Sequence, residues 1–287
     1  MMEKSKIAVI MTVHNRREIT LKGLQTLYNA IANTREDYNF DIFMTDDGCT
    51  DGTRDAVMHS YPSVHIVDGD GNLFWNQGMI KAWNAASSYD DYDYYLWFND
   101  DVDLYVDSLR NLLITSKKHD DQSIIVGSMC DPNDKSLITY SGHDENLRRI
   151  NDCAEEMECF ATNGNLLLIP RIIYKKIGTN DVVFHHCEGD LDYGLRARKA
   201  GFVNYVAAGI FGECARHDNT PRWCNPQYGI YERLNSFYSP FSIIKRKDSF
   251  KFHRRHRGLL IAIKLKCKIY TKLLFPNLVN ASKQYEV

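Results

Sequence analysis

Short hydrophobic runs alternate with longer amphipathic stretches along the first hundred residues of this 287-residue chain. The run Ile7–Val13 is almost continuously hydrophobic, which is typical of a parallel strand buried on both faces. Residues 18–32 instead have the spacing of an amphipathic helix. The same reasoning predicts strands at residues 40–44, 64–67 and 94–98, and helices around residues 56–57 and at 75–87. These alternations predict an α/β fold with a mostly parallel central sheet flanked by helices.

The second half of the chain has a more mixed pattern. Strands are predicted at residues 124–127, 137–140, 165–170 and 203–207, and helices at 171–177 and 190–201, with Gly178 and Gly201 at the helix ends. After Pro240 the composition changes abruptly to basic and aliphatic. We therefore expect one α/β domain over residues 1–240, with halves at 1–103 and 104–240, and a C-terminal tail over residues 241–287.

Charge is distributed unevenly, although the net charge is only −2. From Lys245 onward there are 12 Lys and Arg residues and two acids, whereas the first 244 residues carry 23 basic and 35 acidic groups, a net charge of −12. An acidic body argues against nucleic-acid binding, and a basic tail suits an anionic surface.

The tail pattern favours a basic amphipathic helix on anionic lipid. Lys264, Lys268 and Lys272 recur every four positions, as on one stripe of a helix, although Lys264, Lys266 and Lys268 also alternate as in a strand. A solubilising tail or an oligomer contact is the alternative. No stretch reaches the ~18 apolar residues of a transmembrane helix, and Ile7–Val13 is too short for a signal peptide. We therefore expect a cytoplasmic protein bound peripherally to the inner face of the plasma membrane.

The eight cysteines are scattered and include no Cys-x-x-Cys pair. This pattern predicts reduced thiols, and neither a disulfide framework nor a zinc ribbon. The run His185–Glu188 looks like a zinc site, but adjacent side chains on an extended segment point to opposite faces and rarely reach one ion. We therefore reject a zinc site.

A cluster of acids follows the predicted strand Tyr94–Phe98, in the run Asn99–Asp103. The carboxyl ends of strands in an open α/β sheet are where such sheets bind ligands. Neighbouring acids repel one another unless a cation or hydrogen-bond donors compensate. Hard oxygen ligands suit Mg²⁺ or Mn²⁺, which in turn suit a diphosphate. The alternative is a solvated acidic turn.

A second polar segment, Asp46–Thr53, lies between a predicted strand and a predicted helix. Its glycines would allow a ligand to approach the backbone closely. Asp46 and Asp47 can accept hydrogen bonds from the N–H groups of a nucleotide base or from ribose hydroxyls. Asp51 or Thr53 is alternatively the N-cap of the next helix. That alternative leaves Asp46 and Asp47 unexplained.

Four motifs occur in order along the chain: Thr12–Arg16, Asp46–Thr53, Asn99–Asp101 and Glu188–Arg196. Because of them, roughly residues 6–220 resemble family 2 glycosyltransferases of the GT-A fold. The resemblance implies a nucleotide-sugar donor, a divalent cation and inversion at the anomeric carbon. It also implies that the half before residue 104 binds the nucleotide and the half after it binds the acceptor.

The resemblance implies two groups of donor-binding residues. Those expected to hold the nucleoside are Thr12, His14, Asn15, Arg16, Asp46 and Asp47. Those in a segment similar to the one that contacts diphosphate and sugar are Gly71, Asn72, Trp75 and Gly78. This segment is most like that of relatives using dTDP-rhamnose or a galactofuranose donor, although Phe74 and Trp75 are alternatively core aromatics.

The resemblance also implies a metal site beside the donor. Asn99 and Asp100 stand in the family's metal-binding motif, with Asp101 as the expected ligand of Mg²⁺ or Mn²⁺. His217 resembles a late histidine that completes this site in relatives. Asn163-Gly164 lies where relatives contact the sugar or the acceptor.

Asp190 matches the position of the family's general base. An inverting transfer needs one carboxylate to take the proton of the acceptor hydroxyl as that hydroxyl attacks in line. The metal offsets charge on the departing diphosphate. Asp192 would support the reaction, by bonding the acceptor or by positioning Arg196. For both acids a position in the first turn of a helix is the structural alternative.

We therefore expect an inverting, metal-dependent glycosyltransferase. Its acceptor would be a glycan or a polyprenyl-linked sugar in bacterial surface polysaccharide synthesis. A sugar-phosphate nucleotidylyltransferase is one alternative, but it needs a glycine-rich loop that His14–Arg17 lacks. A non-catalytic glycan-binding protein on the same fold is the other.

Overall fold

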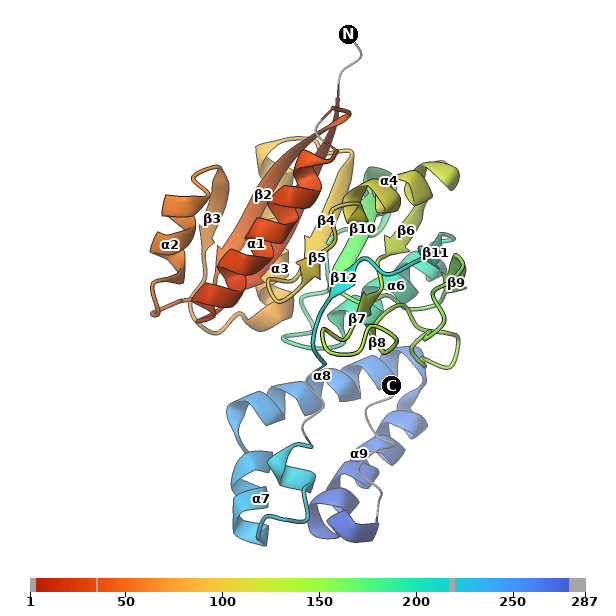
Figure 1. The fold of residues 1–287 in the computed structure, drawn as a ribbon. Coiled ribbons are helices and arrows are strands. Elements are labelled where there is room, and N and C mark those ends of the chain that lie inside the picture. Colours follow the sequence, from red (N-terminus) through yellow and green to blue (C-terminus); the bar gives the residue numbers. More distant parts are fainter. Residues whose placement is uncertain (1–3, 35, 217–219, 279–287) are drawn as a thin grey trace.

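The first half of the chain forms the parallel part of an α/β body (Figure 1). The computed structural model describes residues 4–34, 36–216 and 220–278. The first elements are β1 (Ser5–Val13), α1 (Arg17–Ala32), β2 (Tyr38–Asp46), α2 (Thr53–Ser60), β3 (Val64–Asp68), α3 (Phe74–Tyr89) and β4 (Tyr94–Phe98). The strands β3, β2, β1 and β4 lie side by side and parallel, which confirms the predicted alternation.

The second half adds antiparallel strands to the same sheet. Its elements are β6 (Ser123–Val126), β9 (Met157–Cys159), β10 (Leu166–Pro170), α5 (Arg171–Ile177), α6 (Gly189–Lys199) and β11 (Val203–Val206). Strand β10 lies antiparallel between β4 and β6, and β9 pairs antiparallel with β11. Within the described residues the sheet order is β3-β2-β1-β4-β10-β6-β11-β9, so the sheet is mixed.

A small second sheet and one more helix complete the body. The sheet order is β5 (Asp103–Leu104), β12 (Gly212–Glu213), β7 (Met129–Cys130) and β8 (Ile138–Tyr140). The helix α4 (Ser108–Lys118) follows β5. We expected the strand at residues 203–207 to be the final one, but β12 follows it in the chain.

Helices cover both faces of the main sheet, which explains the continuous hydrophobic runs of its strands. Ile7, Val9 and Met11 of β1 pack with α1, α2 and α4, whereas Ala8 and Ile10 pack with α3, α5 and α6. Both faces of β1 are therefore buried, and the carboxyl ends of β1, β2 and β4 emerge at one edge of the sheet.

The C-terminal residues form helices below the body (Figure 1). They are η1 (Arg222–Cys224), α7 (Ile230–Phe237), α8 (Pro240–His256), α9 (Leu259–Leu274) and η2 (Pro276–Leu278). The tail is thus helical over these bounds, and the strand alternative is wrong. Gly258, with φ of 90°, separates α8 from α9. Among the described residues, no helix has the length and apolarity needed to cross a membrane.

Candidate active site

The carboxyl ends of β1, β2 and β4 border a cavity of about 470 Å³. Nine of the predicted site residues line it: Thr12, His14, Arg16, Asp47, Gly71, Trp75, Asn99, Asp101 and Asp190. They come from segments far apart in the chain. Their convergence makes this cavity the candidate active site.

Further residues line the cavity, and among them Gly164 was predicted to lie where relatives contact the sugar or the acceptor. They are Val13, Phe74, Tyr140, Gly164, Asn165, His186, Cys187 and Glu188. Glu188 lies within the fourth motif, so its proximity to Asp190 in sequence was a usable signal. Tyr140 ends β8 and Asn165 directly precedes β10, and only the tertiary fold brings these two residues here.

Six predicted site residues lie outside the lining: Asn15, Asp46, Asn72, Gly78, Asp100 and Asp192. Asp46 accepts a hydrogen bond from the Cys49 N–H at 2.8 Å and pairs with Arg54. The Asn15 side chain accepts from the Thr50 N–H at 2.7 Å. These two residues brace the loops around the cavity.

Neither Asn72 nor Gly78 lines the cavity, and the two residues have different surroundings. The Asn72 side chain is exposed, and its carbonyl contacts the His185 ring at 2.7 Å. Gly78 is buried in α3, where a Cβ would stand 2.2 Å from Thr12 Oγ1. Gly78 therefore lets α3 approach β1 closely.

Asp47 organises the loop that leads into α3. Its Oδ1 accepts the N–H groups of Gly71 at 2.9 Å and Leu73 at 3.2 Å, and its Oδ2 accepts that of Phe74 at 2.9 Å. This loop has left-handed backbone at Gly71 and Phe74. The carboxylate of Asp47, which is 3% exposed, thereby sets the position of Trp75 at the cavity.

The acid motif after β4 divides into an inward and an outward carboxylate. Asp100 is 1% exposed and accepts from Thr20 Oγ1 at 2.8 Å and Arg16 at 2.6 Å. Burial, partly offset by the charge of Arg16, raises the pKa of Asp100 to about 6. Asp101 faces the cavity and also pairs with Arg16, at 3.0 Å.

The environment of Asp101 fits a partly exposed divalent cation. Its Oδ1 is buried and finds no hydrogen-bond partner among the described residues. The described part of the chain holds no group of three or more His, Cys, Asp or Glu side chains suited to a metal, and His217 lies outside it. Mg²⁺ often takes only one or two protein carboxylates and completes its shell with phosphate and water. Asp101 with a diphosphate meets that requirement.

Asn99 links the acid motif to two cavity residues. Its Oδ1 accepts from Trp75 Nε1 at 2.7 Å, and its Nδ2 donates to Asn165 Oδ1 at 2.7 Å. The Trp75 ring also packs edge-on against Trp97, at 5.7 Å between centroids. Trp75 is therefore both part of the aromatic core and part of the cavity wall.

Asp190 and Glu188 bring two acids from the second half of the chain to the same cavity. Asp190, in the first turn of α6, accepts the N–H of Gly164 at 3.0 Å and that of Leu191 at 2.9 Å. Burial raises its pKa above the ordinary value. Glu188 has φ of 68°, and burial together with the charges of Asp190 and Asp248 raises its pKa to about 8.

Asp192 points away from the cavity into a charged cluster. Its side chain is fully buried and accepts from Arg196, Arg255 and His256, each at 2.8 Å. Burial acts to raise its pKa, but these hydrogen bonds lower it below the ordinary value. Asp192 therefore joins α6 to α8 and does not face the ligand space.

The segment His185–Cys187 is bent, and not extended as the sequence analysis assumed. Its three consecutive backbone N–H groups all point to Asp248 of α8. The His186 and Cys187 side chains line the cavity.

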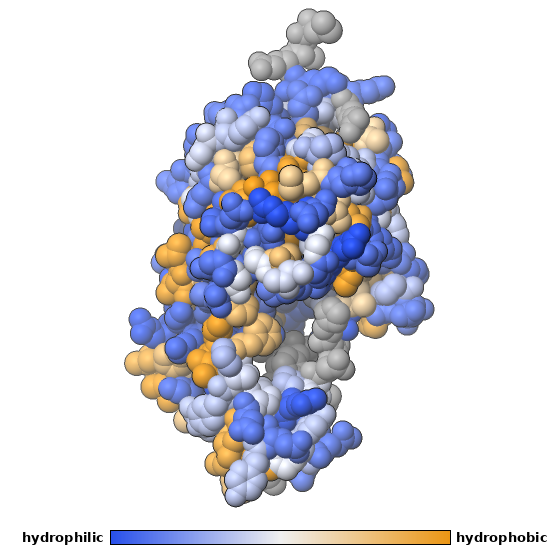
Figure 2. All heavy atoms as spheres, turned by 90° about the vertical axis from the view of Figure 1, so that its left-hand side faces the viewer, coloured by the Kyte–Doolittle hydropathy of each residue, from blue (hydrophilic) through white to orange (hydrophobic). Residues whose placement is uncertain are grey.

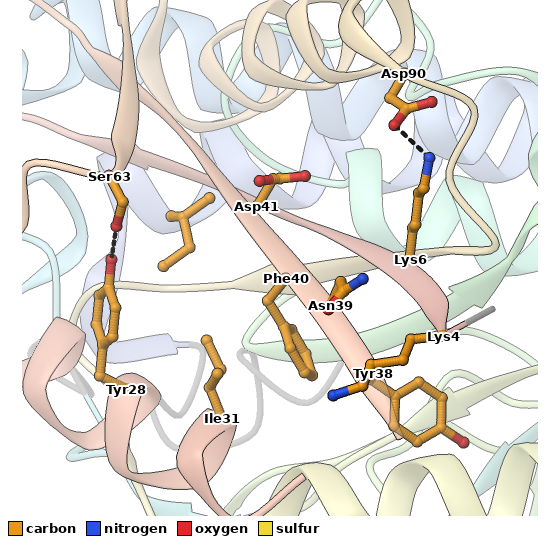
Figure 3. A pocket seen from close by; sticks show the side chains of 11 residues that line it. Lys4, Lys6, Tyr28, Ile31, Tyr38, Asn39, Phe40, Asp41, Ser63 and Asp90 are labelled. Carbon is orange, nitrogen blue, oxygen red and sulfur yellow. Dashed lines mark hydrogen bonds and ion pairs between the residues drawn. The ribbon is translucent and has the colours of Figure 1, made fainter. Parts of the chain in front are cut away.

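A second cavity, of about 660 Å³, lies at the opposite edge of the sheet (Figure 3). It is lined by residues at the amino ends of β1 and β2, with a Lys6–Asp90 ion pair at 2.7 Å and a Tyr28–Ser63 hydrogen bond at 2.8 Å. None of the predicted site residues lines it. Ligand sites of open α/β sheets lie at the carboxyl ends, so the first cavity is the candidate.

Fold and site together define an α/β enzyme with a polar cavity at its strand ends, bordered by acids from both halves of the body. Residues 8–177, more than half of the chain, match the family Glycosyl transferase family 2, and the chain belongs to this family. It is therefore a glycosyltransferase of the GT-A type, which takes a nucleotide-sugar donor and an acceptor. No curated protein matches the chain.

Proposed function

We propose that this glycosyltransferase inverts the anomeric centre, with Asp190 as the general base and Asp101 as a metal ligand. The observation that carries the proposal is that both carboxylates line one cavity, on walls supplied by different halves of the chain. Buried Asp190 has a raised pKa, which brings it closer to the pH at which a base works well. In this arrangement, Asp190 would take the proton of the acceptor hydroxyl, and no covalent enzyme intermediate is required.

The donor would lie between the strand ends of β1 and β2 and the loop before α3. Thr12, His14 and Arg16 would border the nucleoside and phosphates, and Trp75 the sugar. A bound Mg²⁺ or Mn²⁺ would neutralise charge on the departing diphosphate. Asp101 would bind it through Oδ1, which has no hydrogen-bond partner among the described residues.

Calorimetric titration of the full chain with UDP- and dTDP-sugars, with and without Mn²⁺, tests the donor and metal proposals. We expect nucleotide binding that Mn²⁺ strengthens, and we expect Asp101→Ala to lose that strengthening while keeping the metal-free affinity. Asp103→Ala, in the same acidic run but outside the cavity lining, is the matched control. If Mn²⁺ strengthened binding equally in Asp101→Ala, the metal assignment would be wrong.

We further propose dTDP-rhamnose or a UDP-sugar as donor and a glycan or polyprenyl-linked acceptor of bacterial surface polysaccharide synthesis. The support is the similarity of the Gly71–Met79 segment to that of rhamnosyl- and galactofuranosyltransferases. Hydrolysis of a donor panel tests it. A clear preference for a UDP-N-acetylhexosamine would contradict the sugar assignment and leave the class unchanged.

The C-terminal helices supply an amphipathic surface, and we propose that it docks on the anionic inner face of the membrane. Leu260 of α9 is 84% exposed, and the neighbouring Leu259, Ile263, Lys264 and Lys268 are exposed too. On the side of the helical part where α7 lies, Figure 2 likewise shows hydrophobic residues interspersed with hydrophilic ones. Each basic residue near anionic lipid contributes about 1 kcal/mol, and apolar insertion would add a salt-resistant share.

Between α8 and α9 lies a cavity of about 420 Å³ that fits this proposal. Ile243, Phe250, Leu265 and Ile269 give it apolar walls, and Arg246 also contributes to its lining. Such a lining suits an amphiphile with an acidic head group.

Vesicle co-sedimentation of the full chain tests the docking proposal. Leu260→Glu should bind anionic vesicles more weakly than the parent chain. Ile114→Glu, at an exposed position of α4 in the α/β body, is the control and should bind like the parent. Equal sedimentation of all three proteins would exclude α9 as the docking surface.

A further inference from the structure

Helix α8 contacts both the α/β body and α9 and is not a free tail. Phe241, Lys245, Asp248, Phe252 and Arg255, spaced four and three apart, face the α/β body. The other face borders the cavity shared with α9. Helix α8 therefore lies between the body and α9 (Figure 1).

The body-facing side of α8 holds the active-site loop through Asp248. This carboxylate is 1% exposed, and its Oδ2 accepts the N–H groups of His185 at 2.9 Å, His186 at 2.8 Å and Cys187 at 3.3 Å. Hydrogen bonds from backbone N–H groups to a carboxylate are charge-assisted and strong. The bent shape of this segment is thus set by one acid about sixty residues later in the chain.

Arg255 ties both ends of the same loop to α8. It pairs with Asp181 at 2.8 Å, before the loop, and with Asp192 at 2.8 Å, in the first turn of α6. Between those two points lie Glu188 and Asp190, the acids that line the cavity. The loop is therefore fixed at its middle by Asp248 and at both ends by Arg255.

Aromatic packing joins α8 to the donor side of the cavity as well. The Phe241 ring lies 4.8 Å from that of His186 and 6.0 Å from that of Phe74. Both partners line the cavity. A shift of α8 would consequently move both the loop before α6 and the loop before α3.

We infer that Asp248 and Arg255 are positioning residues for the transfer reaction. They lie outside the stretch 8–177 that matches the family, and they hold the 185–190 loop so that Asp190 faces the cavity. The inference rests on the proposed role of Asp190 as base. Helix α8 then belongs with the α/β body that carries the active site. Helix α9 is the part of the tail that is proposed to dock on the membrane.

The test compares three full-length variants with the parent chain. Asp248→Asn keeps the shape and removes the charge that the three N–H groups share. Arg255→Lys keeps the charge but cannot pair with two carboxylates in the same fork geometry. Phe252→Leu, a buried neighbour on the same face, costs stability without removing a hydrogen bond to the loop.

Transfer kinetics, nucleotide affinity and amide exchange should separate positioning from general loosening. A misplacement of about 1 Å can cost roughly 100-fold in rate, so Asp248→Asn and Arg255→Lys should lower kcat by roughly 10–100-fold. The nucleotide Kd should stay within about two-fold, because Asp248 and Arg255 bond to residues between 181 and 192 and to none of the residues proposed to border the nucleoside. The amides of residues 185–187 should exchange faster in Asp248→Asn than in Phe252→Leu.

Asp190→Asn, assayed in parallel, separates failure of this inference from failure of the proposed function. If Asp190→Asn abolishes transfer while Asp248→Asn and Arg255→Lys keep normal kcat, the positioning role is wrong. An equal loss of kcat in Phe252→Leu would also overturn it, because loosening of α8 would then suffice. Normal transfer by Asp190→Asn would instead refute the proposed base.

Discussion

Replacing Asp190 by Asn separates its expected catalytic role from its place in the loop. Each carboxylate oxygen accepts a different backbone N–H, from Gly164 at 3.0 Å and from Leu191 at 2.9 Å. An amide has only one oxygen, so one buried N–H loses its acceptor at a cost of about 1–3 kcal/mol. Because burial already disfavours the charged form of Asp190, the net loss of stability should fall at the low end of that range.

The loss of activity should be much larger than the loss of stability implies. Removing a general base costs roughly 10²–10⁴ in turnover, which corresponds to about 3–5 kcal/mol of transition-state stabilisation. The assay is kcat at saturating donor and acceptor, with nucleotide Kd from calorimetry and the free energy of unfolding from urea titration. Nucleotide affinity should be retained, because the Asp190 carboxylate bonds to Gly164 and Leu191 and to none of the residues proposed to hold the nucleoside.

Thr162→Val is the matched control for this experiment. Thr162 is fully buried and donates from Oγ1 to the backbone carbonyl of Asp190 at 2.7 Å. Valine removes this hydrogen bond at nearly the same volume and leaves the carboxylate in place, so turnover should stay close to that of the parent. Near-normal turnover of Asp190→Asn, or an equal loss in Thr162→Val, would refute the assignment of the base.

Three further results follow from the structure. Gly78→Ala should destabilise the protein by about 1–3 kcal/mol in urea unfolding, because the new methyl group would collide with Thr12; unchanged stability would mean that α3 can move away freely. Turnover should fall on acidification at a pKa above 3.8, the ordinary value for Asp, since Asp190 must be ionised to act as base; a pH–rate profile checks this. The folded state holds the proton of Glu188 more tightly than the unfolded chain does, so stability should decrease as the pH rises from 4.5 towards about 8. Thermal melts at both ends of that range should show this slope in the parent chain and a smaller one in Glu188→Gln.

The parallel half of the fold was predictable because its signals are local. Each strand of that half is a short hydrophobic run, and each crossover helix has its own periodicity, so β1 to β4 follow from the pattern. The direction of β10 has no such signal: Leu166–Pro170 is buried on all sides, and only long-range packing makes it antiparallel to β4. The two-residue strands β5, β7 and β12 are likewise defined by their partners.

The positions of the site residues that directly follow strands were predictable from the sequence, whereas the directions of their side chains were not. Residues directly after β1, β2 and β4 converge because parallel strands end at one edge. Neighbouring acids nevertheless point in different directions: Asp100 turns inward to Thr20 and Arg16, while Asp101 faces the cavity. Asp100 and Asp101 are the same residue type at adjacent positions of the sequence. Only the packing of α1 against this turn distinguishes them.

The contacts of α8 show why charge composition alone does not describe the whole tail. Basic residues dominate the segment after Pro240, and that excess favoured a single helix lying on lipid. One acid, Asp248, stands within this basic stretch with Phe241 and Phe252 on the same helical stripe. A carboxylate is costly to bury without hydrogen-bond donors or cations, so a buried Asp248 implies such donors on the surface that it meets. The three N–H groups of residues 185–187 are those donors, and they connect the helix to the loop that carries Asp190.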